Sequence, residues 1–277
     1  MKDILVLCDS NDSNDYRVET ALCYAKAFDA HIIGVHMIPF PVIPVYGGMV
    51  PDASSYTAAY QIDKAHEHAE SLENSFVGIA NKYNIPYEWK TIEGLDLNFI
   101  IENARYTDLV VAPVAYSHYS NEISHNLCDY FTTKLGRPLL ITPDLNKVFD
   151  LPKRVIIAWD ESHEAARAVH DSLPILNQAD NIQIVSVSKS DINEKENMIR
   201  CEQLQRHLRH HNINCEVFSP DKSPKGTGHT IYESALEYDA ELVVMGAYGH
   251  SKFKEIILGS TTKYLIENST LPLFVSN

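Results

Sequence analysis

Short apolar runs alternate along the chain with longer segments whose apolar residues recur every three to four positions. One run, residues 3–9, reads DILVLCD, and another, residues 154–160, reads RVIIAWD, so both end in an aspartate. Runs of this length predict buried strands, and the longer period predicts amphipathic helices. Each run is followed by a predicted helix and a second predicted strand, at 16–28 and 31–37 in the first half and at 165–176 and 181–187 in the second half.

This order of elements is repeated in the two halves of the chain. The runs at 3–9 and 154–160 are offset by 151 residues, and later pairs of predicted strands by 133 and 134: 107–113 with 240–246, and 137–141 with 271–275. Alternating strands and helices predict an α/β fold with two tandem, doubly wound, Rossmann-like parallel-sheet domains. We expect a polar, proline-flanked linker at 145–152 between domains at 1–144 and 153–277.

The drop in offset from 151 to 133 implies 18 additional residues between the first and fourth strands of the first half. The proline-rich, apolar segment 39–51 has no counterpart in the second half and precedes a long predicted helix from about 55 to 83. We expect an ordered loop or a lid there, because apolar residues on a loop usually cover a surface. A surface connection with local packing is the alternative.

The composition favours a small-molecule partner. The chain has 277 residues, enough for two domains, and a net charge of -14. Nucleic acids and anionic membranes require clusters of Lys and Arg that this composition does not provide, so we expect neither as a partner. With no signal-peptide pattern and no apolar stretch of about 18 residues, we expect a cytoplasmic protein.

Cysteine and histidine do not suggest a metal site or a disulfide framework. The five cysteines are scattered without a CxxC pair, so we expect reduced thiols. His207, His210 and His211 could share a helical face, but no cysteine or carboxylate joins them at ligand spacing. A solvated helix end is therefore favoured over a metal site.

The richest local motif follows the apolar run 241–245. Gly246 and Gly249 end this predicted strand, and Gly259-Ser260 opens a predicted last helix that runs to about Asn268. Glycine at a strand end permits positive φ and close approach of a ligand, and a helix N-terminus offers unpaired N–H groups and a favourable dipole to an anion. Phosphate is the natural ligand. Turns and a helix cap in any α/β fold are the alternative interpretation.

The segments MGAYGHS (245–251), LGSTT (258–262) and LPLFV (271–275) together resemble the ATP-binding signature of the universal stress protein family. The resemblance covers the second half, and a degenerate copy covers the first, so the chain resembles a tandem member of that family. It implies that Val187 and Met245 border adenine and ribose. It implies further that ribose and phosphates meet Gly246, Gly249 and His250, and that the distal phosphates meet Gly259, Ser260 and Thr261. For His250, a solvent-facing loop position is the alternative.

Asp160 ends the first strand of the second half and should face the same crevice as the glycines. A carboxylate repels phosphates unless a cation lies between them, so its expected role is to hold Mg²⁺ bridging phosphate oxygens. The resemblance implies the same role. A helix N-cap for the segment beginning near Ser162 is the alternative.

The first half departs from this pattern at every glycine. Pro113 stands for Gly246, Tyr116 for Gly249, and His125-Asn126 for Gly259-Ser260, while Asp9 remains at the position of Asp160. Proline removes an N–H donor, and the tyrosine side chain would occupy ligand space. We therefore expect one ATP per chain, held in the second half.

The sequence thus predicts an ATP-binding stress-response or regulatory protein with ATP and Mg²⁺ as cofactors. No dedicated catalysis is evident, since GxxxxGK[ST] and an early GxGxxG are missing from the sequence, although slow ATP hydrolysis is possible. A nucleotide-independent, dimerising scaffold or interaction protein is the alternative function. We expect a homodimer or an intramolecular pairing of the two halves, because the apolar closing strands 139–141 and 273–275 would otherwise leave exposed edges.

Overall fold

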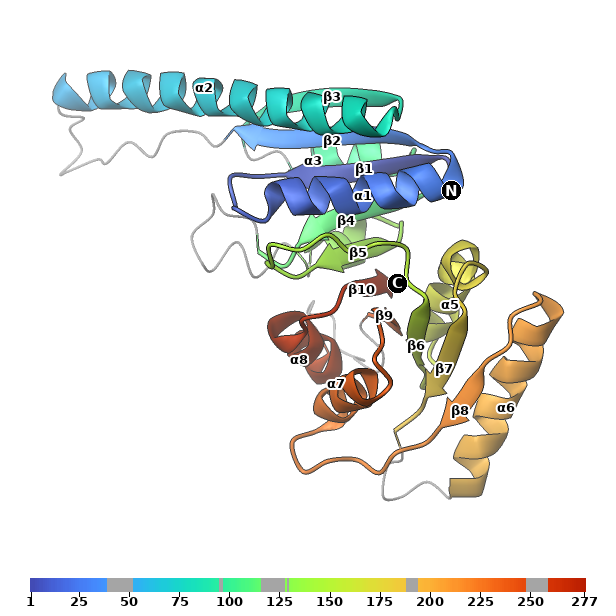
Figure 1. Ribbon diagram of the computed structural model, residues 1–277. Helices are drawn as coiled ribbons and strands as arrows, with labels where there is room; N and C mark the ends of the chain where they lie inside the picture. Colours follow the sequence, from blue (N-terminus) through green and yellow to red (C-terminus); the bar gives the residue numbers. More distant parts are fainter. Residues whose placement is uncertain (39–51, 95–96, 116–127, 129, 188–193, 248–258) are drawn as a thin grey trace.

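The computed structural model describes residues 1–38, 52–94, 97–115, 128, 130–187, 194–247 and 259–277. Its ten described strands form one sheet in the order β3-β2-β1-β4-β5-β10-β9-β6-β7-β8 (Figure 1). Among these strands, every neighbouring pair is parallel except β5 with β10, which is antiparallel. The strands are β1 (Asp3–Cys8), β2 (His31–Ile38), β3 (Tyr87–Glu93), β4 (Leu109–Pro113), β5 (Leu139–Thr142), β6 (Arg154–Ala158), β7 (Asn181–Val185), β8 (Glu216–Phe218), β9 (Leu242–Gly246) and β10 (Leu273–Ser276). The prediction of an α/β fold with parallel sheets is confirmed.

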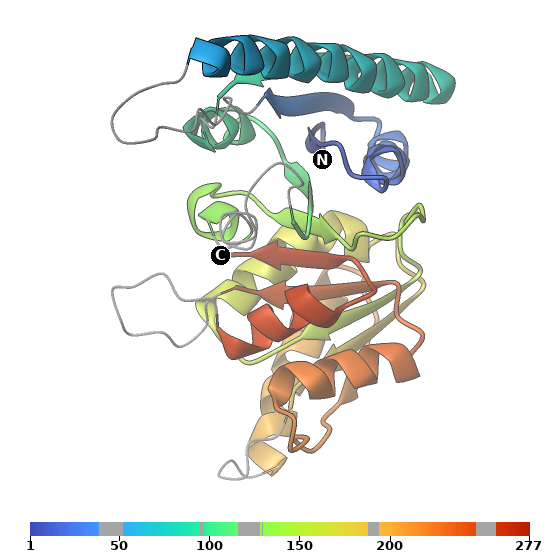
Figure 2. The same cartoon turned by 90° about the vertical axis from the view of Figure 1, so that its left-hand side faces the viewer.

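Helices cover both faces of the sheet and keep to the same face in both halves. The described helices are α1 (Asn14–Phe28), α2 (Asp52–Tyr83), α3 (Leu97–Ala104), α5 (His163–Leu176), α6 (Glu194–His210), α7 (Thr227–Glu237) and α8 (Ser260–Asn268). Buried side chains of α1, α2, α5 and α6 share one apolar cluster, and those of α3, α7 and α8 share the other. Figure 2 shows the sheet between these layers.

The two halves meet at β5 and β10 in the middle of the sheet. Leu140 lies opposite Phe274 in the antiparallel register, and both side chains are fully buried. The strand order on either side of this pair is the same, β5-β4-β1-β2-β3 on one side and β10-β9-β6-β7-β8 on the other. The expected intramolecular pairing of the closing strands is therefore present in the structure.

Both halves also begin with the same carboxylate clasp, a carboxylate that accepts hydrogen bonds from two backbone N–H groups at the start of the first strand. Asp108 Oδ2 accepts hydrogen bonds from the backbone N–H groups of Lys2 (2.5 Å) and Asp3 (3.3 Å). Glu241 Oε2 accepts from the N–H groups of Lys153 (2.5 Å) and Arg154 (3.1 Å). In each half a carboxylate just before the fourth strand thus fixes the start of the first strand.

Much of the additional length of the first half is helical. Helix α2 has 32 residues, whereas its counterpart α6 has 17. The N-terminal end of α2 extends beyond the sheet (Figure 1). The expectation that the extra residues would lie in the proline-rich segment therefore missed the longer helix, and segment 39–51 itself is outside the described residues.

The expected linker, residues 145–152, is packed against the first half. Phe149 is buried, and its N–H group donates to Thr20 Oγ1 of α1 at 3.0 Å. The neighbouring Asp150 Oδ1 accepts from the Cys23 thiol at 3.2 Å. Among the helices that the structure describes, none is long and apolar enough to cross a membrane.

Candidate functional site

A cavity of about 460 Å³ opens at the carboxyl ends of β6, β7 and β9. β6 lies between β9 and β7, and the chain passes from β6 to β7 on one side before crossing back to β9 on the other. The carboxyl ends of parallel strands around such a reversal are the usual position of ligands in open α/β sheets.

Seven residues that the sequence singles out line this one cavity: Asp160, Val187, Met245, Gly246, Gly259, Ser260 and Thr261. They come from three strand ends and one helix start that are distant in sequence. Gly249 and His250 lie outside the described residues. The fold thus brings together every predicted site residue that the structure describes.

Helix α8 presents its N-terminus to the cavity. Gly259 is the N-cap residue, with φ -57° and ψ 143°, and glycine has no side chain with which to cap the helix. The first backbone amides of α8 have no intrahelical acceptor, and together with the helix dipole they favour an anion. A Cβ built on Gly259 meets no described atom within 4 Å.

Gly246 is required for a different reason from the one that the sequence suggested. It is not among the described glycines with positive φ. A Cβ there would lie 2.4 Å from the backbone nitrogen of Ala165 and 2.5 Å from the carbonyl carbon of Glu164. The missing side chain therefore lets the first turn of α5 pack against β9, and a larger residue at Gly246 would disturb the fold as well as the cavity.

Asp160 is exposed at the cavity rim and does not cap α5. The N-cap is Ser162, whose Oγ accepts a hydrogen bond from the Ala165 N–H group at 3.1 Å. Asp160 Oδ1 accepts from the Ser162 N–H group at 3.0 Å and so orders the turn before the helix. Both polar roles at this turn are filled, and the alternative interpretation of the aspartate as the cap is wrong.

The donor set suits Mg²⁺ only together with a ligand. No group of three or more His, Cys, Asp or Glu side chains able to hold a metal occurs among the described residues. Mg²⁺ is commonly bound by one or two carboxylates plus phosphate oxygens and water, so Asp160 fits as a single protein ligand. His207 and His211 lie with ring centroids 4.9 Å apart on α6, but the described residues supply no third ligand for a metal there.

The second half of the chain, which contains the cavity, resembles a known protein family. Residues 152–277 match the model of the universal stress protein family. This part of the chain is similar to a universal stress protein domain. No match was found among curated proteins.

Solved structures of low sequence identity share the fold over the whole chain. A universal stress protein from Archaeoglobus fulgidus DSM 4304 is 18% identical, with a TM-score of 0.75 over 99% of this chain and 98% of that one. A protein of unknown function from Pseudomonas aeruginosa PAO1 is 14% identical, with a TM-score of 0.60 over 100% of this chain and 92% of that one. The full-length likeness extends the fold of the universal stress protein domain to the first half of the chain.

Several residues of the second half line the cavity without having been predicted. They include Trp159, Glu161, Asn197, Arg200 and Lys222. Asn197 is buried, and its Nδ2 donates to the Ser186 carbonyl at 3.1 Å, which fixes the start of α6 against the end of β7. These residues belong to no recognisable motif, and only the fold reveals that α6 borders the cavity. Glu161 and Arg200 form an ion pair, Arg200 Nε to Glu161 Oε2, at 3.0 Å.

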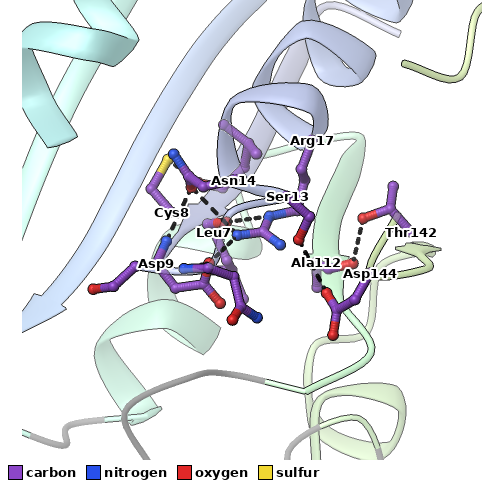
Figure 3. A network of polar contacts seen from close by, with 12 residues as sticks. Leu7, Cys8, Asp9, Ser13, Asn14, Arg17, Ala112, Thr142 and Asp144 are labelled. Carbon is purple, nitrogen blue, oxygen red and sulfur yellow. Dashed lines mark hydrogen bonds and ion pairs between the residues drawn. The ribbon is translucent and has the colours of Figure 1, made fainter. Parts of the chain in front are cut away.

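The matching position in the first half is filled by a buried ion pair (Figure 3). Asp9 is fully buried, and Arg17 Nη2 donates to its Oδ1 at 2.5 Å. Arg17 Nε also donates to the Leu7 carbonyl at 2.9 Å, and the Asp9 N–H group donates to Asn14 Oδ1 at 3.0 Å. Asp9, at the position of Asp160, is therefore paired with a guanidinium.

The second half has no counterpart of this guanidinium, because the residue 151 positions after Arg17 is the buried Ala168.

In the first half, burial raises the pKa of the Cys8 thiol, next to Asp9, to about 12, so that thiol stays protonated. Pro113 ends β4 opposite Thr142, whereas Tyr116, His125 and Asn126 lie outside the described residues.

Proposed function

We propose that this chain is an ATP-binding regulatory protein of the stress response, with the nucleotide held in the cavity of the second half. The observation that carries the proposal is the convergence of seven predicted residues on one cavity of about 460 Å³. That volume lies in the range of pockets that enclose small ligands. The family match of residues 152–277 supports the stress-response role.

In the proposed complex, the phosphates lie at the N-terminus of α8. The amides after Gly259 and the hydroxyl groups of Ser260 and Thr261 supply donors, and the helix dipole favours the negative charge. Adenine and ribose lie toward Val187 and Met245, which line the cavity at the ends of β7 and β9. Gly249 and His250 remain predicted contacts.

Mg²⁺ is proposed to join Asp160 to the phosphates. Asp160 is exposed at the cavity rim, where its carboxylate would otherwise repel a triphosphate. The bound cation would offset that repulsion and orient the phosphate oxygens.

We infer further that residues 1–144 are a degenerate copy of the domain at 153–277, joined to it by 145–152. The repeated strand order and the repeated carboxylate clasp support this inference. The buried pair of Asp9 and Arg17 supports the absence of a nucleotide site in the first half, since both charges are already paired with each other. One ATP per chain follows.

Calorimetric titration with Mg²⁺ and ATP tests the proposal directly. We expect one site per chain with a dissociation constant in the micromolar range, which corresponds to roughly 8 kcal/mol. Gly259→Val should abolish binding, because its side chain would enter space that no described atom fills and that lies beside the α8 amides. The backbone at Gly259 has negative φ, so the fold tolerates the change.

Gly78→Val is the matched control. Gly78 is an exposed residue of α2, and its Cβ would also meet no described atom within 4 Å. Unchanged binding by Gly259→Val would remove the assignment of the site, and a ratio near two would show that the first half binds as well. Failure of the unaltered protein to bind ATP would favour the nucleotide-independent scaffold.

A further inference from the structure

The cavity runs across the carboxyl edge of the sheet from one helical layer to the other. Leu265 and Ile266 of α8 belong to the apolar cluster on one face, whereas Cys201 and Leu204 of α6 belong to the cluster on the opposite face. Both α8 and α6 contribute lining residues. A nucleotide with its phosphates at α8 and its adenine beside Val187 and Met245 would have the edge of the base facing the α6 side of the cavity.

Arg200 of α6 lies at this second end of the cavity and is held in place. Its Nε forms an ion pair with Glu161 Oε2 at 3.0 Å, and the two side chains are 39% and 38% exposed. The pair joins α6 to the turn between β6 and α5. Within the described ranges, the Arg200 side chain has no other hydrogen bond or ion pair.

Glu161 adopts an unusual backbone conformation at this turn. Its φ is 61°, in the left-handed region that non-glycine residues seldom occupy. Such strain persists where surrounding structure imposes it and is concentrated at ligand sites. Here it accompanies a side chain that reaches Arg200 across the turn.

Trp159 adds an aromatic group and an unused donor on the same face. It lines the cavity and packs against the cluster that includes Leu204 of α6. Its indole Nε1 is buried and has no hydrogen-bond partner among the described residues.

We propose that Arg200, positioned by Glu161, contacts the aromatic base of the bound nucleotide and is a determinant of base binding in this pocket. This inference rests on the proposed function. The planar guanidinium stacks on aromatic rings, and Glu161 offsets much of its charge, which favours an uncharged base over a phosphate as its partner. The phosphates have the amides of α8 on the opposite face.

Calorimetry with adenosine and with Mg²⁺-ATP tests the assignment through four proteins: the unaltered chain, Arg200→Met, Arg200→Lys and Arg206→Met. Arg206 lies exposed on the same helix and does not line the cavity, so it is the matched control for loss of an α6 arginine. We expect Arg200→Met to weaken adenosine and ATP by the same factor, roughly 3- to 10-fold, as for a partly exposed cation–π contact. Arg200→Lys should give a similar loss, because lysine keeps the positive charge but lacks the planar guanidinium group that stacks on the base.

Each contrary outcome has a defined meaning. A loss that is larger for ATP than for adenosine would assign Arg200 to the phosphates and overturn the inference, as would full retention of affinity in Arg200→Lys or Arg200→Met. Absence of binding by the unaltered protein would overturn the proposed function itself, and this inference with it. An equal loss in Arg206→Met would show a general effect on α6 and not a contact.

The positioning role of Glu161 is tested by a double-mutant cycle. Glu161→Gln keeps an oxygen that can accept a hydrogen bond from Arg200 but removes the negative charge. We therefore expect a smaller loss of adenosine affinity than in Arg200→Met, about 2- to 3-fold, in the range of an exposed ion pair. In the Arg200→Met background the same substitution should have no effect on adenosine affinity. Additive losses in the double variant would show that Glu161 does not act through Arg200.

Discussion

Gly246 shows how a residue can be predicted correctly and explained wrongly. The sequence places it at a strand end beside a ligand site, and it does line the cavity. Its missing Cβ, however, faces the backbone of Glu164 and Ala165 at the start of α5. A glycine motif in a sequence cannot distinguish close approach of a ligand from close approach of a helix, because both require a residue without a Cβ.

We therefore predict that Gly246→Ala destabilises the whole protein by about 3 kcal/mol, the upper end of the usual cost of overpacking. The methyl group would meet a backbone nitrogen at 2.4 Å, and backbone cannot move aside as a side chain can. Urea denaturation followed by circular dichroism measures the change. Gly78→Ala is the control and should be slightly stabilising, because alanine favours an exposed helix. Equal stability of the Gly246→Ala variant and the unaltered protein would contradict this account.

Asp160 is suited to a test that separates metal binding from folding. Asp160→Asn keeps an acceptor oxygen for the Ser162 N–H group, so the turn before α5 should be preserved. We predict a weaker affinity for Mg²⁺-ATP, by about tenfold, and a much smaller change for ATP measured in excess chelator, since only the first uses the carboxylate charge. Parallel titrations measure both. Equal losses with and without Mg²⁺ would argue against the metal role.

At the scale of elements, the hydrophobic pattern predicted eight of the ten described strands but did not single out β3, β8, α3, α6 or α7. The last helix was expected from Ser260 to about Asn268 and is observed there, and the expected strands differ from those observed mainly at their ends. Strand ends shift because a hydrogen-bonded ladder depends on the neighbouring strand, which a local pattern does not contain. The predicted fold class therefore survives, while individual boundaries move.

The part of the site contributed by α6 could not be predicted in the same way. Arg200 and Asn197 belong to a helix whose pattern is mostly polar, and nothing local marks them as cavity residues. They meet the ends of β6 and β7 only after the sheet has formed. Arg17 is a similar case, because a charged residue on a helix is normally expected at the surface, yet here it is buried against Asp9.

At the scale of the molecule, the continuous sheet should make the two halves unfold together. The apolar cluster that contains Leu140 of β5 also contains Phe274 of β10 and residues of helices from both halves. We predict that Phe274→Ala lowers the free energy of unfolding by about 3–5 kcal/mol, the usual cost of deleting a buried phenyl ring. The protein should still unfold in one transition.

The two tryptophans make this measurable, because Trp89 lies in the first half and Trp159 in the second. Denaturation of the Trp89→Phe and Trp159→Phe variants, each in the presence and absence of Phe274→Ala, reports on one half at a time. Phe218→Ala on edge strand β8 is the control and should cost less than about 1 kcal/mol, since Phe218 is 38% exposed. Separate transitions for the two tryptophans would show that the halves are independent.

The central position of β10 has a consequence for how the chain is made. β10 lies between β5 and β9 in the sheet, yet it follows β5 by 134 residues in sequence. During synthesis from the N-terminus, the first half can assemble β1 to β5 early, but the outer edge of β5 must wait for its neighbour until the second half has been translated. An open edge of a strand that is mostly apolar, as β5 is, is a template for pairing with other chains. The nascent protein is therefore most exposed to aggregation in that interval, and a chaperone that shields β5 on the ribosome would act there.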